Sequence, residues 1–197
     1  MPGTRDRILV ATTELFRRHG YNGTSLKKVT TAARATTGSL YHFFPGGKSA
    51  LAEAFIAESG AAYQQLFELM VDEVADPARA IGDFFEGAAI VLEASDFVDV
   101  CPIGTVAGEI ASSHEGLRVA ADRVFAGWIS AGASRFERAG MAASDAEALA
   151  TTVVAALEGG FLLARCRRDA DLLRRTGRDI RALVSARMAE VPVKPRG

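Results

Sequence analysis

The sequence lacks the residue spacings that signal a metal site or a covalent catalyst. It has only two cysteines, Cys101 and Cys166, which stand far apart; this argues against a disulfide scaffold and a CxxC metal site. The three histidines show no HExxH spacing, and there is no GxSxG sequence. The GGKS sequence that ends at Ser49 does not complete a phosphate-binding loop, because His42 occupies the position of the first glycine. We therefore expect no metal, no cofactor and no enzymatic activity.

Long apolar segments are also lacking. The first residues contain no apolar stretch of the kind found in a signal peptide. The charge-free run Ala148–Leu157 is far shorter than the roughly 18 to 20 residues that span a bilayer. These features predict a cytoplasmic protein without a membrane partner.

Alternating strand patterns are absent, and apolar residues recur every three to four positions instead. This periodicity predicts an all-α fold of about nine helices. The expected helices are 4–19, a short one capped by Thr24, 37–43, about 49–74, one after Asp76-Pro77, a short one from Pro102, 115–139, one capped by Ser144, and about 171–189.

Charge is distributed unevenly along the chain, although the formal net charge is only -1. Residues 1–50 contain eight basic and two acidic residues, whereas the remainder contains 15 basic and 22 acidic ones. A basic N-terminal segment on an acidic body indicates that only this segment meets a polyanion such as nucleic acid.

The segment from Thr24 to Phe43 has the dimensions of a helix-turn-helix. Two short helices are expected around a tight connection at Ala33-Arg34-Ala35, and Thr36 is expected to cap the second helix. Gly38 and Ser39 are small, which would let that helix approach base edges closely. The pattern therefore favours binding of double-stranded DNA.

Residues 8–51 resemble the DNA-binding domain of the TetR family of bacterial repressors. The matching positions are Leu15, Phe16, Gly20, Tyr21, Thr24, Ser25, Gly38, Leu40, Tyr41, Phe44 and Lys48. The sequence CPIGTVAGEIA at 101–111 resembles the LmrA/YxaF-like branch of that family. Three positions depart from the family pattern: Arg34 replaces the usual turn glycine, Thr37 a frequent lysine, and Thr30 the usual alanine. These departures concern which groove contacts are made.

The resemblance implies a set of DNA-contacting residues. Thr36, Tyr41, His42 and Lys48 would contact phosphates. Thr37, Gly38 and Ser39 would face the major groove, and Ser25 and Lys27 would assist from the first short helix. The partner would be a palindromic operator, because family members bind DNA as dimers.

The resemblance also implies a cavity in the helical body for a small, largely apolar or aromatic effector. The expected ligand-binding residues are Phe67, Met70, Phe84, Phe85, Ala88, Cys101, Ile103, Val106, Glu109, Ile110, Phe125, Trp128 and Phe161. Aromatic residues at helical spacing are more often part of an ordinary core, and Glu109 is as readily a solvated or helix-paired acid as a ligand contact.

The last two long helices are candidates for a homodimer interface, since small residues on the first of them permit close approach of a partner helix. The expected interface residues are Thr152, Ala156, Gly159, Leu173, Ile180, Leu183 and Val184. Packing of both helices within their own chain is the alternative.

These observations together predict three segments: a helix-turn-helix domain at 1–48, a ligand-binding and dimerisation domain at 49–191, and a disordered tail at 192–197. The predicted function is that of a dimeric repressor released from its operator by an effector. A helical interaction protein that does not bind DNA is the alternative.

Overall fold

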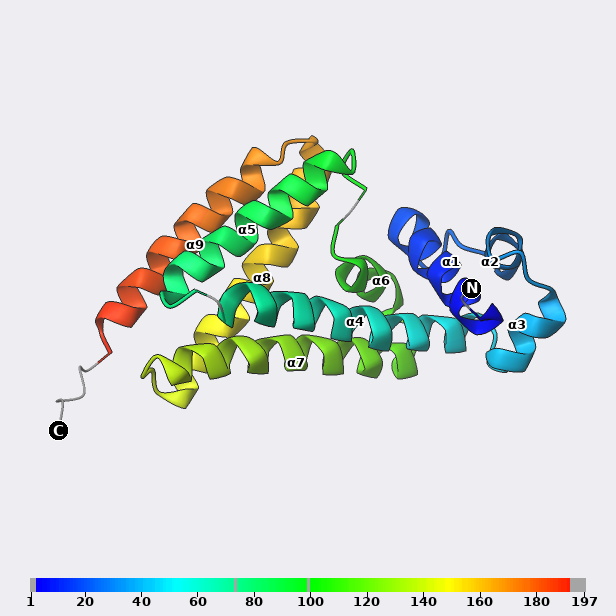
Figure 1. Ribbon diagram of the computed structural model, residues 1–197, viewed down its shortest axis with the longest axis horizontal. Coiled ribbons are helices and arrows are strands. Elements are labelled where there is room, and N and C mark those ends of the chain that lie inside the picture. The colour runs from blue at the N-terminus through cyan, green and yellow to red at the C-terminus, as the bar shows by residue number, and fades with distance from the viewer. Residues whose placement is uncertain (1–2, 73, 99, 192–197) are drawn as a thin grey trace. The chain divides into compact units, whose positions relative to one another are not determined.

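The computed structural model describes residues 3–72, 74–98 and 100–191. These residues form nine α-helices and no strand (Figure 1), which confirms the predicted fold class. The helices are α1 (Thr4–His19), α2 (Leu26–Ala32), α3 (Thr37–Phe43), α4 (Lys48–Asp72), α5 (Pro77–Ala94), α6 (Pro102–Ile110), α7 (Glu115–Arg138), α8 (Ala143–Arg167) and α9 (Asp171–Ala189). The tail predicted at 192–197 lies outside the described residues.

The chain forms two compact units. The head unit contains the described residues of Met1–Tyr63 and Val98–Val124, and the body unit those of Gln64–Phe97 and Phe125–Gly197. The head unit includes all the described residues of the DNA-binding domain predicted at 1–48. The first parts of α4 and α7, together with all of α6, belong to the head unit. Leu51 of α4 packs in the core formed with α1–α3, α6 packs against α1, and Gly60 of α4 lies against Val124 of α7.

The core of the head unit explains why its short helices are stable. The apolar faces of α1 to α4 meet around seven buried residues: Ile8, Ala11, Val29, Ala33, Leu40, Phe44 and Leu51. Phe16 of α1 meets Phe55 of α4 edge to face, with ring centroids 5.3 Å apart. Helices of seven residues are marginal in isolation, so this tertiary burial holds α2 and α3 in place.

Two of the expected helix caps lie at different residues. Ser25, not Thr24, caps α2, because its side chain accepts a hydrogen bond from the backbone N–H of Lys28. Thr24 is buried instead, and its hydroxyl donates to the carbonyl of Gly20. The α8 helix begins at Ala143 after Ala142, so Ser144 lies inside its first turn and does not cap it.

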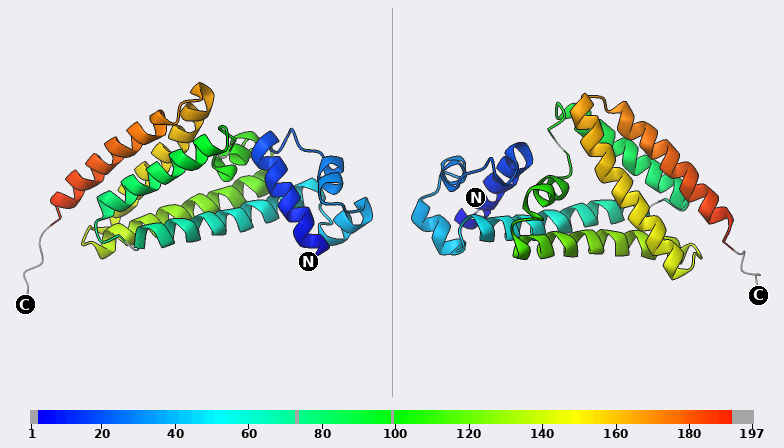
Figure 2. Two further views of the ribbon diagram at one scale, coloured as in Figure 1. Left: turned by 45° about the horizontal axis from the view of Figure 1, so that its top comes forward. Right: turned by 180° about the vertical axis from the view of Figure 1, so that it is seen from behind.

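Within the body unit, α5 and α9 run side by side and α8 packs against α9 (Figures 1 and 2). Glycines permit the close approach. A Cβ added to Gly177 of α9 would lie 2.4 Å from the Cβ of Phe85, and one added to Gly160 of α8 would lie 2.5 Å from Leu173. Phe85 and Leu173 are both fully buried and thus form the core of this unit.

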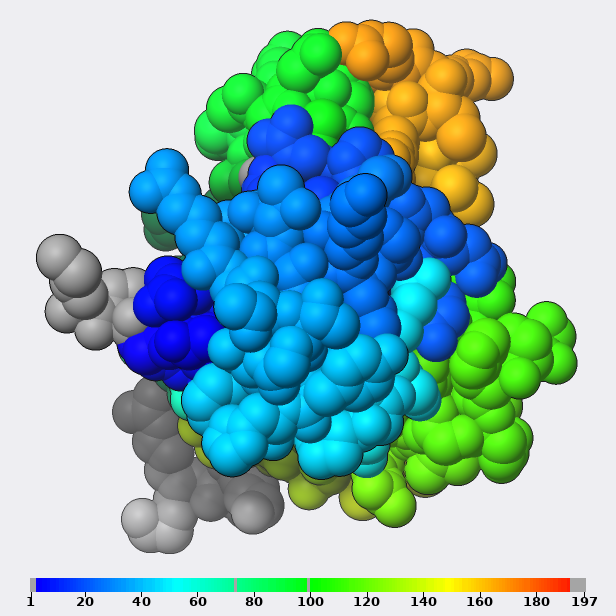
Figure 3. Space-filling model, turned by 90° about the vertical axis from the view of Figure 1, so that its right-hand side faces the viewer, coloured from blue at the N-terminus to red at the C-terminus, as the bar shows by residue number. Residues whose placement is uncertain are grey.

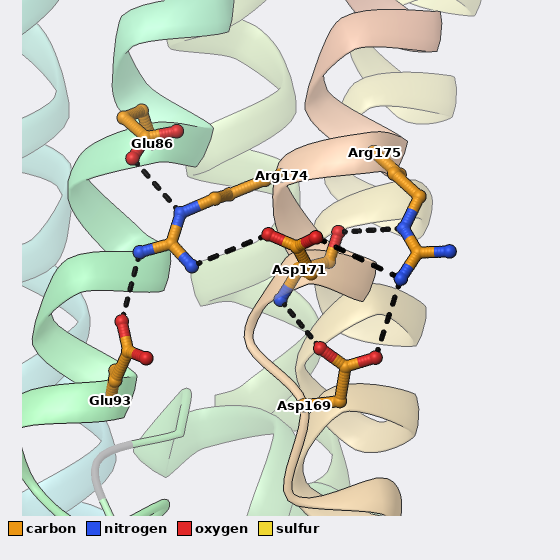
Figure 4. A network of polar contacts seen from close by, with 6 residues as sticks. All are labelled: Glu86, Glu93, Asp169, Asp171, Arg174 and Arg175. Carbon is orange, nitrogen blue, oxygen red and sulfur yellow. Dashed lines mark hydrogen bonds and ion pairs between the residues drawn. The ribbon is translucent and has the colours of Figure 1, made fainter.

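A charged network links α9 to α5 on the surface of the body unit (Figure 4). The guanidinium of Arg174 donates to Glu86 at 3.0 Å and to Glu93 at 2.9 Å. It also lies 3.7 Å from Asp171 on its own helix. Hydrogen bonds to Glu93 and Glu86 raise the pKa of Arg174 above its ordinary value. Because one planar group spans two turns of α5, the network fixes the register of the two helices.

We expect Arg174→Ala to lower the free energy of unfolding by about 1 kcal/mol, since the acidic partners are half exposed and each such pair contributes little. Arg174→Lys should lose most of the same energy, because one ammonium cannot hold both carboxylates in the same way. Urea unfolding at low and high salt provides the measurement, and the difference should shrink with salt. A full rescue by lysine would contradict the bridging role.

Candidate nucleic-acid interface

The residues predicted to contact DNA lie on α2 and α3, at the capping residues that precede these helices, and at the first residue of α4. Figure 3 looks onto these segments, drawn in blue and cyan, which form one continuous surface of the head unit. Seven of the nine are exposed, whereas Ser39 and Lys48 are half-buried. The helix-turn-helix therefore presents most of its predicted contacts to solvent on the head unit itself.

The beginning of α3 is a small, open surface. The Thr36 side chain accepts a hydrogen bond from the backbone N–H of Ser39 at 3.0 Å, and the two hydroxyls lie 2.9 Å apart. A Cβ added to Gly38 would meet nothing closer than Thr36 Oγ1, at 3.8 Å. Gly38 is therefore not required by packing within the chain, and its small size leaves room for a partner from outside.

The beginning of α2 carries the nearby positive charge. Lys27 is exposed, and the ammonium of Lys28 donates to the carbonyl of Gly23 at 2.9 Å. Thr30, one of the departures from the family pattern, is buried, and its hydroxyl donates to the carbonyl of Lys27. The departure at this position thus introduces no unpaired polar group into the core.

The turn between α2 and α3 adopts the conformation that its usual glycine would favour. Arg34 has a φ of 49°, in the left-handed region, and its side chain is exposed. The backbone N–H groups of Arg34 and Ala35 donate to the carbonyls of Thr31 and Thr30. Hydrogen bonds on both sides of the turn hold the arginine in a geometry that costs an L-residue roughly 1 kcal/mol.

Tyr41 is about half exposed at the end of α3. The loop after α3 sets its position, because Gly47 has a φ of 62° and a Cβ there would lie 3.3 Å from the Tyr41 ring. Gly47 thus limits where the Tyr41 ring can lie, and the resemblance did not identify this position. The signal for it was the Gly46-Gly47 pair before Lys48.

Lys48 has partners within the head unit. Its ammonium lies over the ring of Tyr21, 4.3 Å from the ring centroid. Burial lowers the pKa of Lys48, and the charge of Glu109 partly opposes this effect. On its other side, the Tyr21 ring meets His114 edge to face at 5.1 Å. Lys48 is therefore held in an aromatic and acidic environment, unlike the exposed Lys27.

The predicted ligand-binding residues divide between the two units. Cys101, Ile103, Val106, Glu109 and Ile110 belong to the head unit, and the other eight belong to the body unit. In the body unit, half-buried Phe67 meets Phe84, and Phe125 meets Trp128, each pair edge to face. Met70 reaches Gly87 of α5.

Two of the predicted ligand-binding residues contact other parts of the chain. Phe85 packs against Gly177 in the contact between α5 and α9. The carboxylate of Glu109 accepts a hydrogen bond from the backbone N–H of Asn22 at 2.7 Å. Glu109 therefore points at the turn between α1 and α2, and its role in effector binding stays a prediction.

The predicted interface residues divide between buried and exposed positions. Leu173, Ile180 and Val184 are buried within their own chain, as the alternative interpretation expected for these helices. Thr152 and Gly159 are exposed, and Ala156 is half-buried. With Leu163, which is 56% exposed, these three form one helical face that we call the α8 stripe. Leu183 of α9 is also exposed.

The α8 stripe lies on an unusually apolar helix. By length and composition alone, α8 could cross a membrane, and only 33% of its most apolar window is buried within the chain. Core helices of soluble proteins pass the same test. Among the described residues, α8 therefore leaves a large apolar surface without cover from its own chain.

Two family models match the chain on the segments described above. The model for bacterial regulatory proteins of the tetR family matches residues 8–55, and that for the C-terminal domain of LmrA/YxaF-like transcriptional regulators matches residues 77–179. The chain belongs to the TetR family of transcriptional regulators. It lies in the LmrA/YxaF-like branch, has a DNA-binding domain and, like the rest of this family, is not an enzyme.

Individual relatives agree with this assignment. The regulator is 32% identical to the HTH-type transcriptional regulator YxaF of Bacillus subtilis, over 84% of its own length and 87% of that protein. It is also 32% identical to LmrA of the same organism, over 81% and 85% of the two chains. Its fold matches the regulatory protein TetR from Rhodobacter sphaeroides with a TM-score of 0.81 and 24% identity, over 91% and 97% of the chains. The match over residues 8–55 decides against a helical protein without a DNA-binding domain.

Proposed function

We propose that this regulator is a homodimeric repressor of the cytoplasm, which binds a palindromic operator and leaves it when a small, largely apolar effector binds. The open surface at Gly38, beside the exposed side chains of α2 and α3, carries the DNA-binding part of the proposal. Thr37, Gly38 and Ser39 read base edges in the major groove. Tyr41, His42 and Lys27 contact phosphates.

The dimer part of the proposal rests on the α8 stripe. Exposing the apolar face of α8 to water is unfavourable in free energy, and a second copy of α8 would cover this face. Small residues at Ala156 and Gly159 let two such helices approach closely. Two heads related by a two-fold axis then read two half-sites of a palindrome, about one or more helical turns apart.

The effector part rests on the aromatic residues of the body unit. Phe67, Phe84, Phe125 and Trp128 are each only half-buried in the chain. Aromatic rings that other side chains cover only partly can pack against a planar apolar molecule. The effector would bind the DNA-free conformation more tightly than the DNA-binding conformation. The ratio of these two affinities sets how far the effector lowers the affinity for DNA.

Selection of binding sites from a random pool of double-stranded DNA, with the purified full-length protein, tests the DNA-binding part. We expect enrichment of a palindrome, and an affinity that falls steeply with salt. Each phosphate neutralised by a basic residue contributes a slope of about -0.9 in a log–log plot, so four contacts across a dimer predict a slope near -3.6. Absence of an enriched sequence at moderate salt would contradict the proposal.

The effector part is tested with the enriched DNA. Planar aromatic compounds that raise the melting temperature of the protein should also release it from this DNA. A compound that stabilises the protein but leaves its DNA affinity unchanged would argue against release by an effector.

A further inference from the structure

The end of α6 is attached to the turn that precedes α2. Within the head unit, α6 packs against α1 (Figures 1 and 2). Glu109, on the last turn of α6, accepts a hydrogen bond from the backbone N–H of Asn22 at 2.7 Å, across 87 residues of sequence. The attachment is therefore tertiary and specific to one side chain.

Gly20 makes room for this carboxylate. A Cβ added to Gly20 would lie 1.7 Å from Glu109 Oε1, a distance at which no side chain could be accommodated without displacing Glu109. Gly20 also has a φ of 69°, which favours glycine. The carboxylate thus lies directly over the backbone of the turn, with one oxygen on Gly20 and the other on Asn22.

A basic side chain lies close to the Glu109 carboxylate. The Lys48 ammonium is held nearby over the Tyr21 ring; burial lowers the pKa of Lys48, and the charge of Glu109 partly opposes this effect. Hydrogen bonds from a backbone N–H to a charged acceptor are stronger than those between neutral groups. Glu109 therefore has both a directional contact, to Asn22, and a longer-range attraction, to Lys48.

The turn that Glu109 holds leads straight into the DNA-binding surface. Three residues after Asn22, Ser25 caps α2, and Lys27 follows on the first turn of that helix. A turn that is ordered before binding loses less conformational entropy when the helix meets DNA.

We propose that Glu109 is a positioning residue for DNA binding, which clamps the turn between α1 and α2 to α6 and so fixes the beginning of α2. The inference rests on the proposed DNA-binding function. The contact joins the end of α6 directly to the turn that precedes α2.

Asn22 is the only asparagine in the chain, which makes the contact measurable by itself. Protein labelled with 15N-asparagine gives a single backbone amide signal, from the donor of the hydrogen bond. In Glu109→Ala, we expect this signal to shift and its exchange with solvent to accelerate at least about tenfold. Glu109→Gln should retain slow exchange, because the amide oxygen still accepts. Equally slow exchange in Glu109→Ala and the wild type would overturn the inference.

DNA binding then tests the positioning role, with the sequence enriched by selection as the probe. The decisive comparison is Glu109→Ala against Glu109→Gln, because both variants remove the same negative charge. We expect the alanine variant to bind about five- to tenfold more weakly than the glutamine variant. Equal affinities would overturn the inference while leaving the proposed function intact. A wild type that enriches no DNA would overturn the proposed function itself.

Gly108→Ala is the matched control on α6. Gly108 directly precedes Glu109, and a Cβ there meets nothing within 4 Å. The control should match the wild type in melting temperature, in the Asn22 signal and in DNA affinity. A loss of DNA affinity in this variant equal to that of Glu109→Ala would show that any change in α6 has the same effect, and would overturn the specific role of Glu109.

Discussion

Gly38→Leu is expected to weaken binding to the operator at least about 100-fold while leaving the protein folded. The added side chain meets open space in the free protein, since nothing lies closer than 3.8 Å to a Cβ at this position. Leucine also favours a helix more than glycine does, by roughly 0.5 to 1 kcal/mol. The free energy of unfolding should therefore stay the same or rise slightly.

The loss of affinity follows from the place of Gly38 in the proposed complex. A leucine on the first turn of α3 would occupy the space between the helix and the base edges, and so push the helix out of the groove. Each base pair that is no longer read costs about 1–3 kcal/mol, so two lost pairs in one half-site account for the effect. Fluorescence anisotropy with the selected DNA measures the affinity, and urea unfolding measures the stability.

Gly116→Leu is the matched control for this variant. Gly116 is the second residue of α7, as Gly38 is of α3, and a Cβ there also meets nothing within 4 Å. The control should bind DNA like the wild type. Unchanged DNA affinity in Gly38→Leu, with normal folding, would show that α3 does not enter a groove at this residue.

Gly159→Arg is expected to convert the proposed dimer to a monomer and to weaken operator binding about 100-fold or more. Gly159 lies in the α8 stripe, and a Cβ there meets nothing within 4 Å in the chain itself, so the monomer should fold normally. In the proposed dimer, the arginine places a charge in an apolar contact between two close helices. Because two linked heads gain roughly 10² to 10⁴ over one head, separating them removes most of the operator affinity.

Sedimentation velocity checks the oligomeric state, and the selected operator checks the affinity. Glu147→Arg is the control, since Glu147 is exposed on α8 but lies off the stripe. It introduces an arginine on the same helix and should remain dimeric. A Gly159→Arg protein that stays dimeric would place the interface elsewhere.

Local signals were sufficient to predict most helices. The bounds 4–19, 37–43 and 171–189 agree with the structure, because α1 ends before Gly20, α3 ends before a proline-containing loop, and α9 begins after a short polar connection. The two wrong caps show the limit of such signals. Thr24 and Ser25 are both good capping residues, and only the tertiary burial of the Thr24 side chain decides between them.

Contacts between distant segments could not be predicted in the same way. The apolar spacing of Leu173, Ile180 and Val184 is interpreted from sequence as a dimer surface, with packing inside the chain as the alternative, and the structure buries all three within the chain. Glu109 could not be assigned from sequence, because its partner Asn22 is 87 residues away and contributes only a backbone group. A backbone N–H donor cannot be recognised from the pattern of side chains in a sequence. The strained turn at Arg34 was predictable, since the position is defined by its neighbours within the motif.

The uncovered apolar face of α8 has a consequence for how the regulator responds to its own abundance. When only the dimer reads both half-sites, and protomers are scarcer than the dimer dissociation constant, the active species rises with the square of the protomer concentration. A twofold fall in expression then lowers the concentration of active dimer by about fourfold. The occupancy of the promoter would thus change more steeply than the concentration of the protein. The packing of the two α8 helices would set the dimer dissociation constant, and so the protein concentration below which the regulated genes respond in this way.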